Sequence, residues 1–143
     1  LQHIATAAAG SITYDDLISI SYALRAGYRQ KAAWMLNSTA LSSVRKLKDD
    51  QGNYIWQPSQ QAGQPSMLAG FAVVENEDMP AVASGALPIA FGDFKRAYRI
   101  LDVRGIRTLR DPYTNKPYVH FYTTKRVGGG VADTRAVKLL KVG

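Results

Sequence analysis

Histidine, cysteine and acidic side chains are the residues best suited to chemistry, and this sequence offers few of them in useful positions. The 143 residues include two histidines, His3 and His120, and no cysteine. A catalytic histidine needs an oriented base and a nucleophile beside it, and neither histidine has such partners at a suggestive spacing. Without cysteine there is no disulfide, thiolate nucleophile or Cys-ligated metal site. We therefore predict no catalytic residue, no metal site and no cofactor.

Two acidic stretches resemble cation sites in composition but not in spacing. Glu75, Glu77 and Asp78 lie within four residues of one another, and paired carboxylates can bind a hard cation or transfer protons. Their spacing matches no known loop, so we interpret them as a solvated loop or as salt-bridge partners between chains, with a fortuitous cation site left open. The segment DDQGN, residues 49–53, lacks the alternating ligands and closing Glu of a calcium loop, and predicts a turn at Gly52.

Glycine and arginine patterns near the C-terminus suggest phosphate binding only weakly. The segment VGGGVADTR lacks the spacing and the Lys-Ser/Thr of phosphate-binding loops, so residues 128–130 predict a sharp β reversal instead. Arg104, Arg107 and Arg110 recur every three residues. On an alternating strand they cannot all share one face, which disfavours a single stripe that tracks phosphates.

Charge is unevenly distributed along the chain, whose net charge is +7. Residues 1–94 carry six basic and eight acidic side chains, whereas residues 95–143 carry twelve and three. Such a basic region predicts contact with a polyanion or with an acidic neighbour. Aromatic residues among its cations could stack on single-stranded nucleic acid or form ordinary cross-strand pairs; they are Tyr113, Tyr118, Phe121 and Tyr122, beside Lys116, Lys125 and Arg126.

Two amphipathic helices are predicted in the first half. Thr13 and Asp16 resemble a capping box, hydrophobic residues then recur at helical spacing, and Gly27 is a suitable C′ residue, which together predict a helix over 14–25. After the short apolar strand 32–36, Asn37 or Ser38 caps a second helix over 38–48. No stretch approaches the roughly 18 uncharged apolar residues of a membrane span.

The rest of the chain is predicted to be mainly β. Strands are expected at 54–56, 67–74, 89–91, 94–103, 104–110 and 118–124, with a turn at DPYTNKP. With reversal at the three glycines, the last thirty residues should form a hairpin ending in 136–142. Two early helices and a largely antiparallel section predict an α+β fold in which the helices cover a central sheet.

Several segments occur in the order found in one protein family. They are NYIWQPS, QAGQPSMLAGFAVVENEDMP, IAFGDFKRAYRILDVRGIRTLRDPY and FYTTKRVGGGV. From about Thr13 to its end the chain resembles the C-terminal half of HK97-like tailed-phage major capsid proteins. This resemblance implies a structural, non-enzymatic subunit of a virion, assembled in the bacterial host cytoplasm. The family's N-terminal arm, extended loop and spine helix have no counterpart here, so we expect the chain to be a fragment.

The resemblance also implies a domain division and a set of partners. Residues 1–113 would form the axial domain and residues 114–143 the C-terminal strands of the peripheral domain. The implied partners are copies of the chain in capsomers and packaged DNA bound without sequence specificity, with scaffold, protease or decoration proteins as further candidates and no membrane. Two alternatives stay open, namely an encapsulin-type shell protein and a basic nucleic-acid-binding module.

Three further expectations follow from the resemblance. Some family members crosslink neighbouring subunits through Lys and Asn with help from a Glu, but Pro117 and Thr124 occupy the approximate positions of the acceptor and the carboxylate, so we expect no crosslinking. Without the arm and spine, the chain should be monomeric or weakly associated in dilute solution. The polar loop 57–66 should lie at the axial tip and become ordered mainly by contacts with neighbouring subunits.

Overall fold

A computed structural model describes residues 1–8, 10–56 and 66–143 of the chain. The chain forms two compact units, Leu1–Ala97 with Asp133–Gly143, and Tyr98–Ala132. Residues 113 and 114, between which the resemblance places a domain boundary, both lie within the second unit. The polar loop 57–66 lies outside the described residues except for Ser66.

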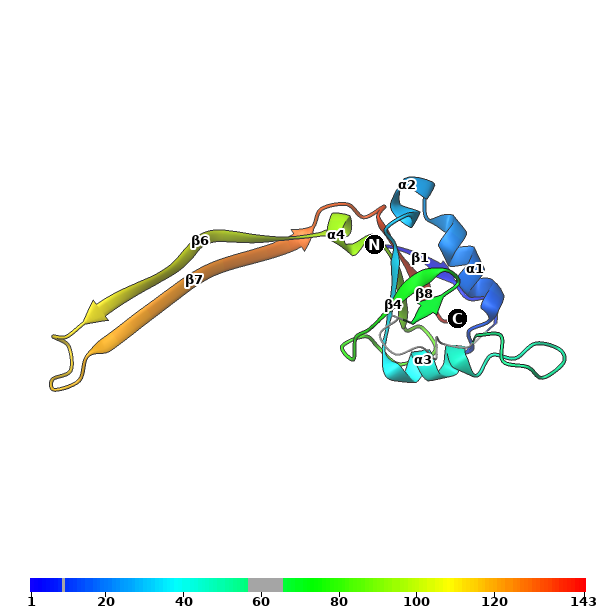
Figure 1. Ribbon diagram of the computed structural model, residues 1–143, viewed down its shortest axis with the longest axis horizontal. Helices are drawn as coiled ribbons and strands as arrows, with labels where there is room; N and C mark the ends of the chain where they lie inside the picture. The colour runs from blue at the N-terminus through cyan, green and yellow to red at the C-terminus, as the bar shows by residue number, and fades with distance from the viewer. Residues whose placement is uncertain (9, 57–65) are drawn as a thin grey trace. The chain divides into compact units, whose positions relative to one another are not determined.

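A mixed six-stranded sheet forms the centre of the first unit (Figure 1). Its strand order is β1-β8-β5-β2-β4-β3, in which β1 with β8 and β2 with β4 are parallel and the other neighbours are antiparallel. The strands are β1 (Gln2–Ala5), β2 (Ala33–Leu36), β3 (Met67–Leu68), β4 (Phe71–Glu75), β5 (Ile89–Gly92) and β8 (Val137–Lys141).

Helix α1 (Tyr14–Ala23) begins as the sequence predicts. The Thr13 hydroxyl accepts a hydrogen bond from the backbone N–H of Asp16, and the Asp16 carboxylate accepts one from the N–H of Thr13, which completes the capping box. The end of the helix differs from the prediction, because Leu24 is already extended and Gly27 lies in the short helix α2 (Ala26–Arg29). Gly27 is therefore not the C′ residue.

Helix α3 (Ser38–Arg45) follows β2 directly. The Asn37 side chain accepts a hydrogen bond from the N–H of Ala40 at 2.8 Å, as an N-cap residue should, and its amide donates to the Met79 carbonyl at 3.0 Å. One asparagine thus fixes the start of the helix and holds the loop after β4. The helix is shorter than predicted and ends at Arg45.

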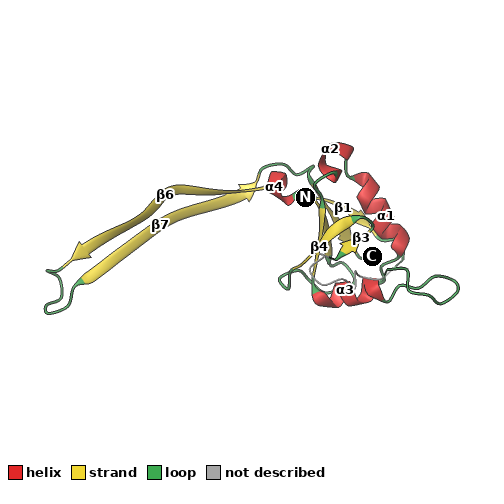
Figure 2. Cartoon of the chain, viewed as in Figure 1, coloured by secondary structure: helices red, strands yellow, loops and turns green. Residues whose placement is uncertain are grey.

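The helices α1 and α3 contribute to one hydrophobic core with the sheet, as predicted for an α+β fold (Figure 2). Trp34 and Phe91 are at its centre, with ring centroids 4.2 Å apart, and the Trp34 indole donates to the Leu68 carbonyl at 2.9 Å. The fully buried residues around them include Leu17, Ile20, Leu24, Leu36, Ile89 and Leu140. A second, smaller hydrophobic cluster is formed by the buried residues Ala90, Ala97, Ala136 and Val137.

Several strand predictions were wrong in detail. Residues 54–56 form only an isolated bridge from Tyr54 to Lys48, and 67–74 is divided into β3 and β4 by a turn in which Ala69 and Gly70 have positive φ. The segment expected to begin a strand at Phe94 is first a helical turn, α4 (Phe94–Ala97), whose start is held by Asp93.

The second unit is one long hairpin of β6 (Tyr98–Asp111) and β7 (His120–Val131). The chain reverses at 112–119, where DPYTNKP predicted a turn, and not at the three glycines. Gly128, Gly129 and Gly130 lie within β7, opposite Leu101, Ile100 and Arg99. The predicted hairpin over the last thirty residues was therefore wrong, because β8 joins the central sheet between β1 and β5.

Candidate functional site

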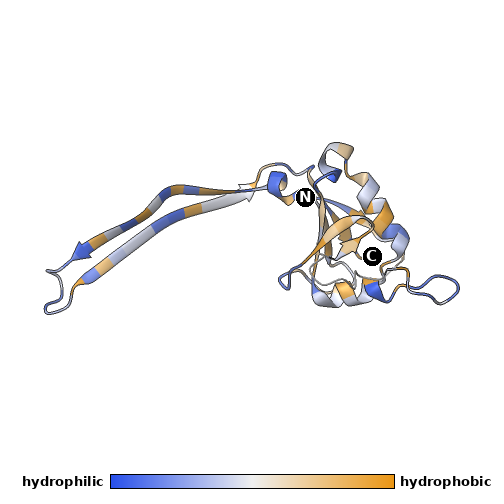
Figure 3. Cartoon of the chain, viewed as in Figure 1, coloured by the Kyte–Doolittle hydropathy of each residue, from blue (hydrophilic) through white to orange (hydrophobic). Residues whose placement is uncertain are grey.

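The hairpin β6–β7 exposes large hydrophobic side chains together with charged ones. Every residue of β7, and every residue of β6 before Asp111, is exposed. Ile100 is 73% exposed, Ile106 68% and Phe121 65%, values far above those of ordinary core residues. Figure 3 shows polar and apolar residues alternating along β6, whereas much of β7 has intermediate hydropathy. Such a hairpin is marginal alone in water and needs further protein to cover it.

Two irregularities in β6 decide which side chains share a face. Asp102 pairs with Val127, Arg104 with Arg126, and Arg107 with Thr124, so β6 gains one extra residue at each step. An extra residue in one strand inverts the alternation of its side chains relative to the partner strand. Arg107 therefore lies on the same face as Arg104 despite their spacing of three.

This face carries a small pocket, here called the arginine pocket. It has a volume of about 150 Å³ and is lined by Arg104, Gly105, Arg107, Thr124 and Arg126. Among the residues that the structure describes, none of these arginines forms a salt bridge. Arg110 pairs with Phe121 and lies on the opposite face. The three arginines of the sequence pattern thus do not share one face, as predicted, but two of them join Arg126.

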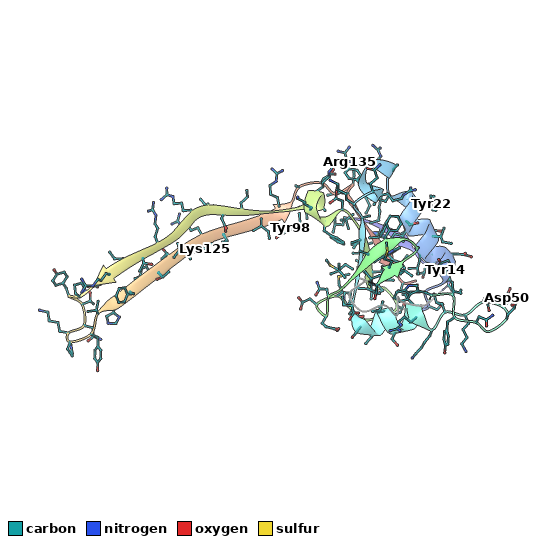
Figure 4. The ribbon with its side chains drawn as sticks, viewed as in Figure 1. Tyr14, Tyr22, Asp50, Tyr98, Lys125 and Arg135 are labelled. Atoms are coloured by element: carbon teal, nitrogen blue, oxygen red, sulfur yellow. The ribbon has the colours of Figure 1, made fainter. Side chains whose placement is uncertain are left out.

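The opposite face of the hairpin is held by cross-strand pairs. Lys125, labelled in Figure 4, contacts Asp102 at 3.2 Å, and the Thr108 and Thr123 hydroxyls are 3.3 Å apart. A Cβ added to Gly129 would be 3.0 Å from the ring of Tyr98. The glycine therefore gives room for the tyrosine to lie across the strand, a role different from the reversal that the sequence suggested.

The connection between β6 and β7 is organised by Asp111. Its carboxylate accepts hydrogen bonds from the Thr114 hydroxyl and from the N–H groups of Tyr113 and Thr114. The bond from the Thr114 hydroxyl is the main reason that the pKa of Asp111 lies below its ordinary value. Pro117 is in this connection, whereas Thr124 is in β7 and lines the arginine pocket. The aromatic residues predicted to stack on nucleic acid or on each other are exposed: Tyr113, Tyr118, Phe121 and Tyr122.

The acidic residues Glu75, Glu77 and Asp78, here called the acidic loop, lie at and after the end of β4. All three are exposed, and within the described part of the chain none forms a salt bridge. Asn76 fixes the backbone between them, because its N–H donates to the Leu36 carbonyl at 2.9 Å and its side chain accepts from the N–H of Asp78 at 3.0 Å. The loop thus presents three carboxylates from an anchored backbone.

The other residues considered for chemistry belong to separate elements of the chain. His3 is in β1 and His120 begins β7, in different units. Residues 49–53 form the predicted turn, in which the Asp49 carboxylate accepts from the N–H groups of Gln51 and Asn53 and Gly52 has positive φ. Within residues 1–8, 10–56 and 66–143, no group of three or more His, Asp or Glu side chains could hold a metal ion. No helix among them is long and apolar enough to span a membrane.

Comparison with solved structures identifies the fold. The capsid of an empty GTA particle, computed with C5 symmetry, matches with 45% identity and a TM-score of 0.82, over 100% of this chain and 50% of the other. The capsid of the native GTA particle matches equally well, with the same identity, coverage and TM-score. This chain therefore spans about half the length of those capsid chains.

More distant structures share the fold alone. Gordonia phage Cozz matches at 13% identity and a TM-score of 0.59, over 99% of this chain and 50% of that one. The holo-SrpI encapsulin complex of Synechococcus elongatus matches at 14% identity and 0.64, over 98% and 52%. The architecture is therefore the α+β fold of HK97-like shell proteins.

The family itself follows from the sequence. The model of the phage capsid family matches residues 1–142. The chain belongs to the phage capsid family, as the ordered sequence segments predicted. A comparison with curated proteins finds no match.

Proposed function

We propose that this chain is part of a shell subunit that assembles with copies of itself into a closed capsid enclosing DNA. The observation that carries the proposal is the 45% identity, over the whole chain, to the capsid chain of an assembled particle with five-fold symmetry. The exposed hairpin supports it, because a two-stranded ribbon with large apolar side chains needs covering by the rest of a longer subunit or by its neighbours. The particle would be a virion or a virion-like particle formed in the bacterial host.

The division into two units supports a revised domain assignment. We propose that Leu1–Ala97 with Asp133–Gly143 corresponds to the axial domain and that the hairpin Tyr98–Ala132 belongs to the peripheral domain. In this assignment the last strand, β8, returns to the axial sheet. The expected boundary at 113/114 would then mark the tip of the peripheral hairpin and not the junction between domains.

Assembly of the complete subunit tests the proposal. The subunit that contains this chain is expressed, purified and imaged by electron microscopy, and closed particles of uniform size are expected. Residues 1–143 alone, measured by light scattering, should remain monomeric or weakly associated, because stable interfaces bury at least about 1,000 Å² and the chain is half the length of its relatives. A complete subunit that stays monomeric under all assembly conditions would contradict the proposal.

The complete subunit and the isolated chain also distinguish the proposed capsid function from an encapsulin-type shell protein and from a nucleic-acid-binding module. The encapsulin reading rests on fold alone, since that match is only 14% identical. Particles that retain a cargo protein and exclude DNA would favour it. A salt-sensitive shift of DNA by the isolated chain, without particle formation by the complete subunit, would favour a nucleic-acid-binding module.

A further inference from the structure

Two groups of opposite charge remain unpaired among the described residues of this chain. The arginine pocket contributes three positive side chains, and the acidic loop contributes three negative ones. The three described salt bridges use other residues, namely Arg96 with Asp93, Lys125 with Asp102 and Arg135 with Asp133. Both groups are exposed and both are held by a defined backbone, one by the paired strands and one by Asn76.

The arrangement of positive charges in the arginine pocket favours the binding of an anion. Arg104 and Arg126 are directly opposite each other in the hairpin, and like charges in that position destabilise a strand pair. The bulge adds Arg107 to the same face, beside the Thr124 hydroxyl. Guanidinium groups bind carboxylates with two parallel hydrogen bonds, so three of them around about 150 Å³ suit one or two carboxylates.

The extent of the patch favours discrete carboxylates over a nucleic acid backbone. Arg110, the next arginine along β6, lies on the opposite face, and Asp111 returns to the pocket's face with a negative charge. A site that follows a polyanion needs a continuous positive path, and toward the tip of the hairpin this path ends at the pocket. Arg99, opposite Gly130, lies on the same face toward the other end of the hairpin. Every copy of the chain supplies discrete carboxylates of this kind in its acidic loop.

We propose that the arginine pocket of one copy binds the acidic loop of a neighbouring copy in the shell. The inference rests on the proposed function, because it requires copies to meet, and it specifies which surfaces do so. The contact is heterologous, joining two different surfaces, so that each copy can donate its loop to one neighbour and receive a loop from another. Such charge pairing fixes register and disfavours wrong contacts between like surfaces.

Charge reversal in the complete subunit tests the pairing. One variant carries Arg104→Glu, Arg107→Glu and Arg126→Glu, a second carries Glu75→Lys, Glu77→Lys and Asp78→Lys, and a third carries all six changes. Each of the first two should reduce the yield of closed particles at least tenfold, and the combined variant should restore it to within about threefold of the wild type. Arg110→Glu and Asp50→Lys are single charge reversals outside the two surfaces and should leave the yield unchanged.

The outcomes distinguish failure of this inference from failure of the proposed function. A wild-type subunit that forms no particles contradicts the proposed function itself. Wild-type particles together with unaffected reversal variants, or with folded single-surface variants that the combination does not rescue, overturn the inference. Normal particles that lose DNA only when the arginines are reversed would also overturn it and would identify the pocket as a nucleic acid contact.

A conservative variant keeps the test decisive if charge reversal prevents folding. Arg126→Lys places an amine in the pocket, where a carbodiimide can join it to a carboxylate in contact. Particles assembled from mixed ¹⁴N and ¹⁵N subunits should yield peptides linking residue 126 of one isotope to residues 75–78 of the other. Absence of such mixed peptides from intact particles, or links within single subunits only, would overturn the inference.

Discussion

Replacing Asp16 with Asn should destabilise the first unit more than any other single loss of charge on helix α1. Its side chain is buried, and its carboxylate accepts three hydrogen bonds, from the Thr13 N–H at 2.9 Å, the Thr13 hydroxyl at 2.7 Å and the Ala7 N–H at 3.0 Å. A hydrogen bond to a charged group contributes about 1.5–3 kcal/mol. Asn keeps one acceptor oxygen but turns an NH₂ group toward a donor, so D16N should cost about 2–4 kcal/mol.

Urea denaturation followed by circular dichroism measures this cost. With a slope of about 2 kcal/mol per M, the loss corresponds to a shift in midpoint of about 1–2 M. Asp15 is the matched control, because it occupies the same first turn but is exposed, so D15N loses only a helix-dipole contribution of about 0.3–1 kcal/mol. Equal midpoints for D16N and D15N at neutral pH would refute the reasoning.

The same carboxylate predicts a pH dependence. Burial, the largest single influence, raises the pKa of Asp16, but the N–H and hydroxyl of Thr13 and the N–H of Ala7 together lower it below the ordinary 3.8. A lowered native pKa adds stability above the unfolded value, and that stability is lost as the pH falls through the native value. The difference between wild type and D16N should therefore be full at neutral pH and shrink below 3.8. A difference that stays constant into strong acid would contradict it.

Two further substitutions test the packing of the first unit. Gly92→Ala should destabilise it by about 2–4 kcal/mol, measured by thermal denaturation, because the added Cβ would overlap the Ala136 carbonyl oxygen and lie 2.7 Å from the Val137 Cα. Gly105→Ala is the control, since a Cβ there would meet open space, and it should have little effect in the same measurement. Tyr28→Phe removes the 2.6 Å hydrogen bond to the Asp133 carboxylate, which is the main cause of the lowered pKa of Asp133. The substitution should lower the urea midpoint at neutral pH, and lower it less below pH 3.8. An unchanged midpoint at neutral pH would contradict the role of this bond.

Local signals predicted the parts of the fold that local chemistry determines. Thr13 with Asp16, and Asn37 ahead of a short apolar pattern, predicted both helix starts, because a cap involves residues only three apart. The buried strand around Trp34 was predicted from its composition for the same reason. The sequence also indicated the turn at 111–117, since Asp, Pro and Asn favour turns by their own backbone preferences.

Non-local pairing determined what the sequence could not predict. Strand β8 pairs with β1, more than a hundred residues earlier, and nothing near Val137 indicates that partner. Gly128–Gly130 looked like a reversal, but Gly129 serves to admit the ring of Tyr98 from the facing strand. The sequence did not predict the arginine pocket, because the residues that share its face depend on the register between the strands. Arg126 lies in β7, outside the arginine repeat of β6. Gly105 between two arginines was the available signal, since an isolated glycine in a strand often marks a bulge.

The distribution of the core separates the stability of this chain from its proposed contacts. Both buried clusters are built from residues outside Tyr98–Ala132, so the hairpin contributes nothing to either of them. Its side chains are free of the packing constraints that make core substitutions costly. The first unit should therefore keep its denaturation midpoint when the arginines of the hairpin are replaced. Assembly and stability then respond to different residues, which allows surface variants of the hairpin to be read as tests of contacts between copies and not of folding.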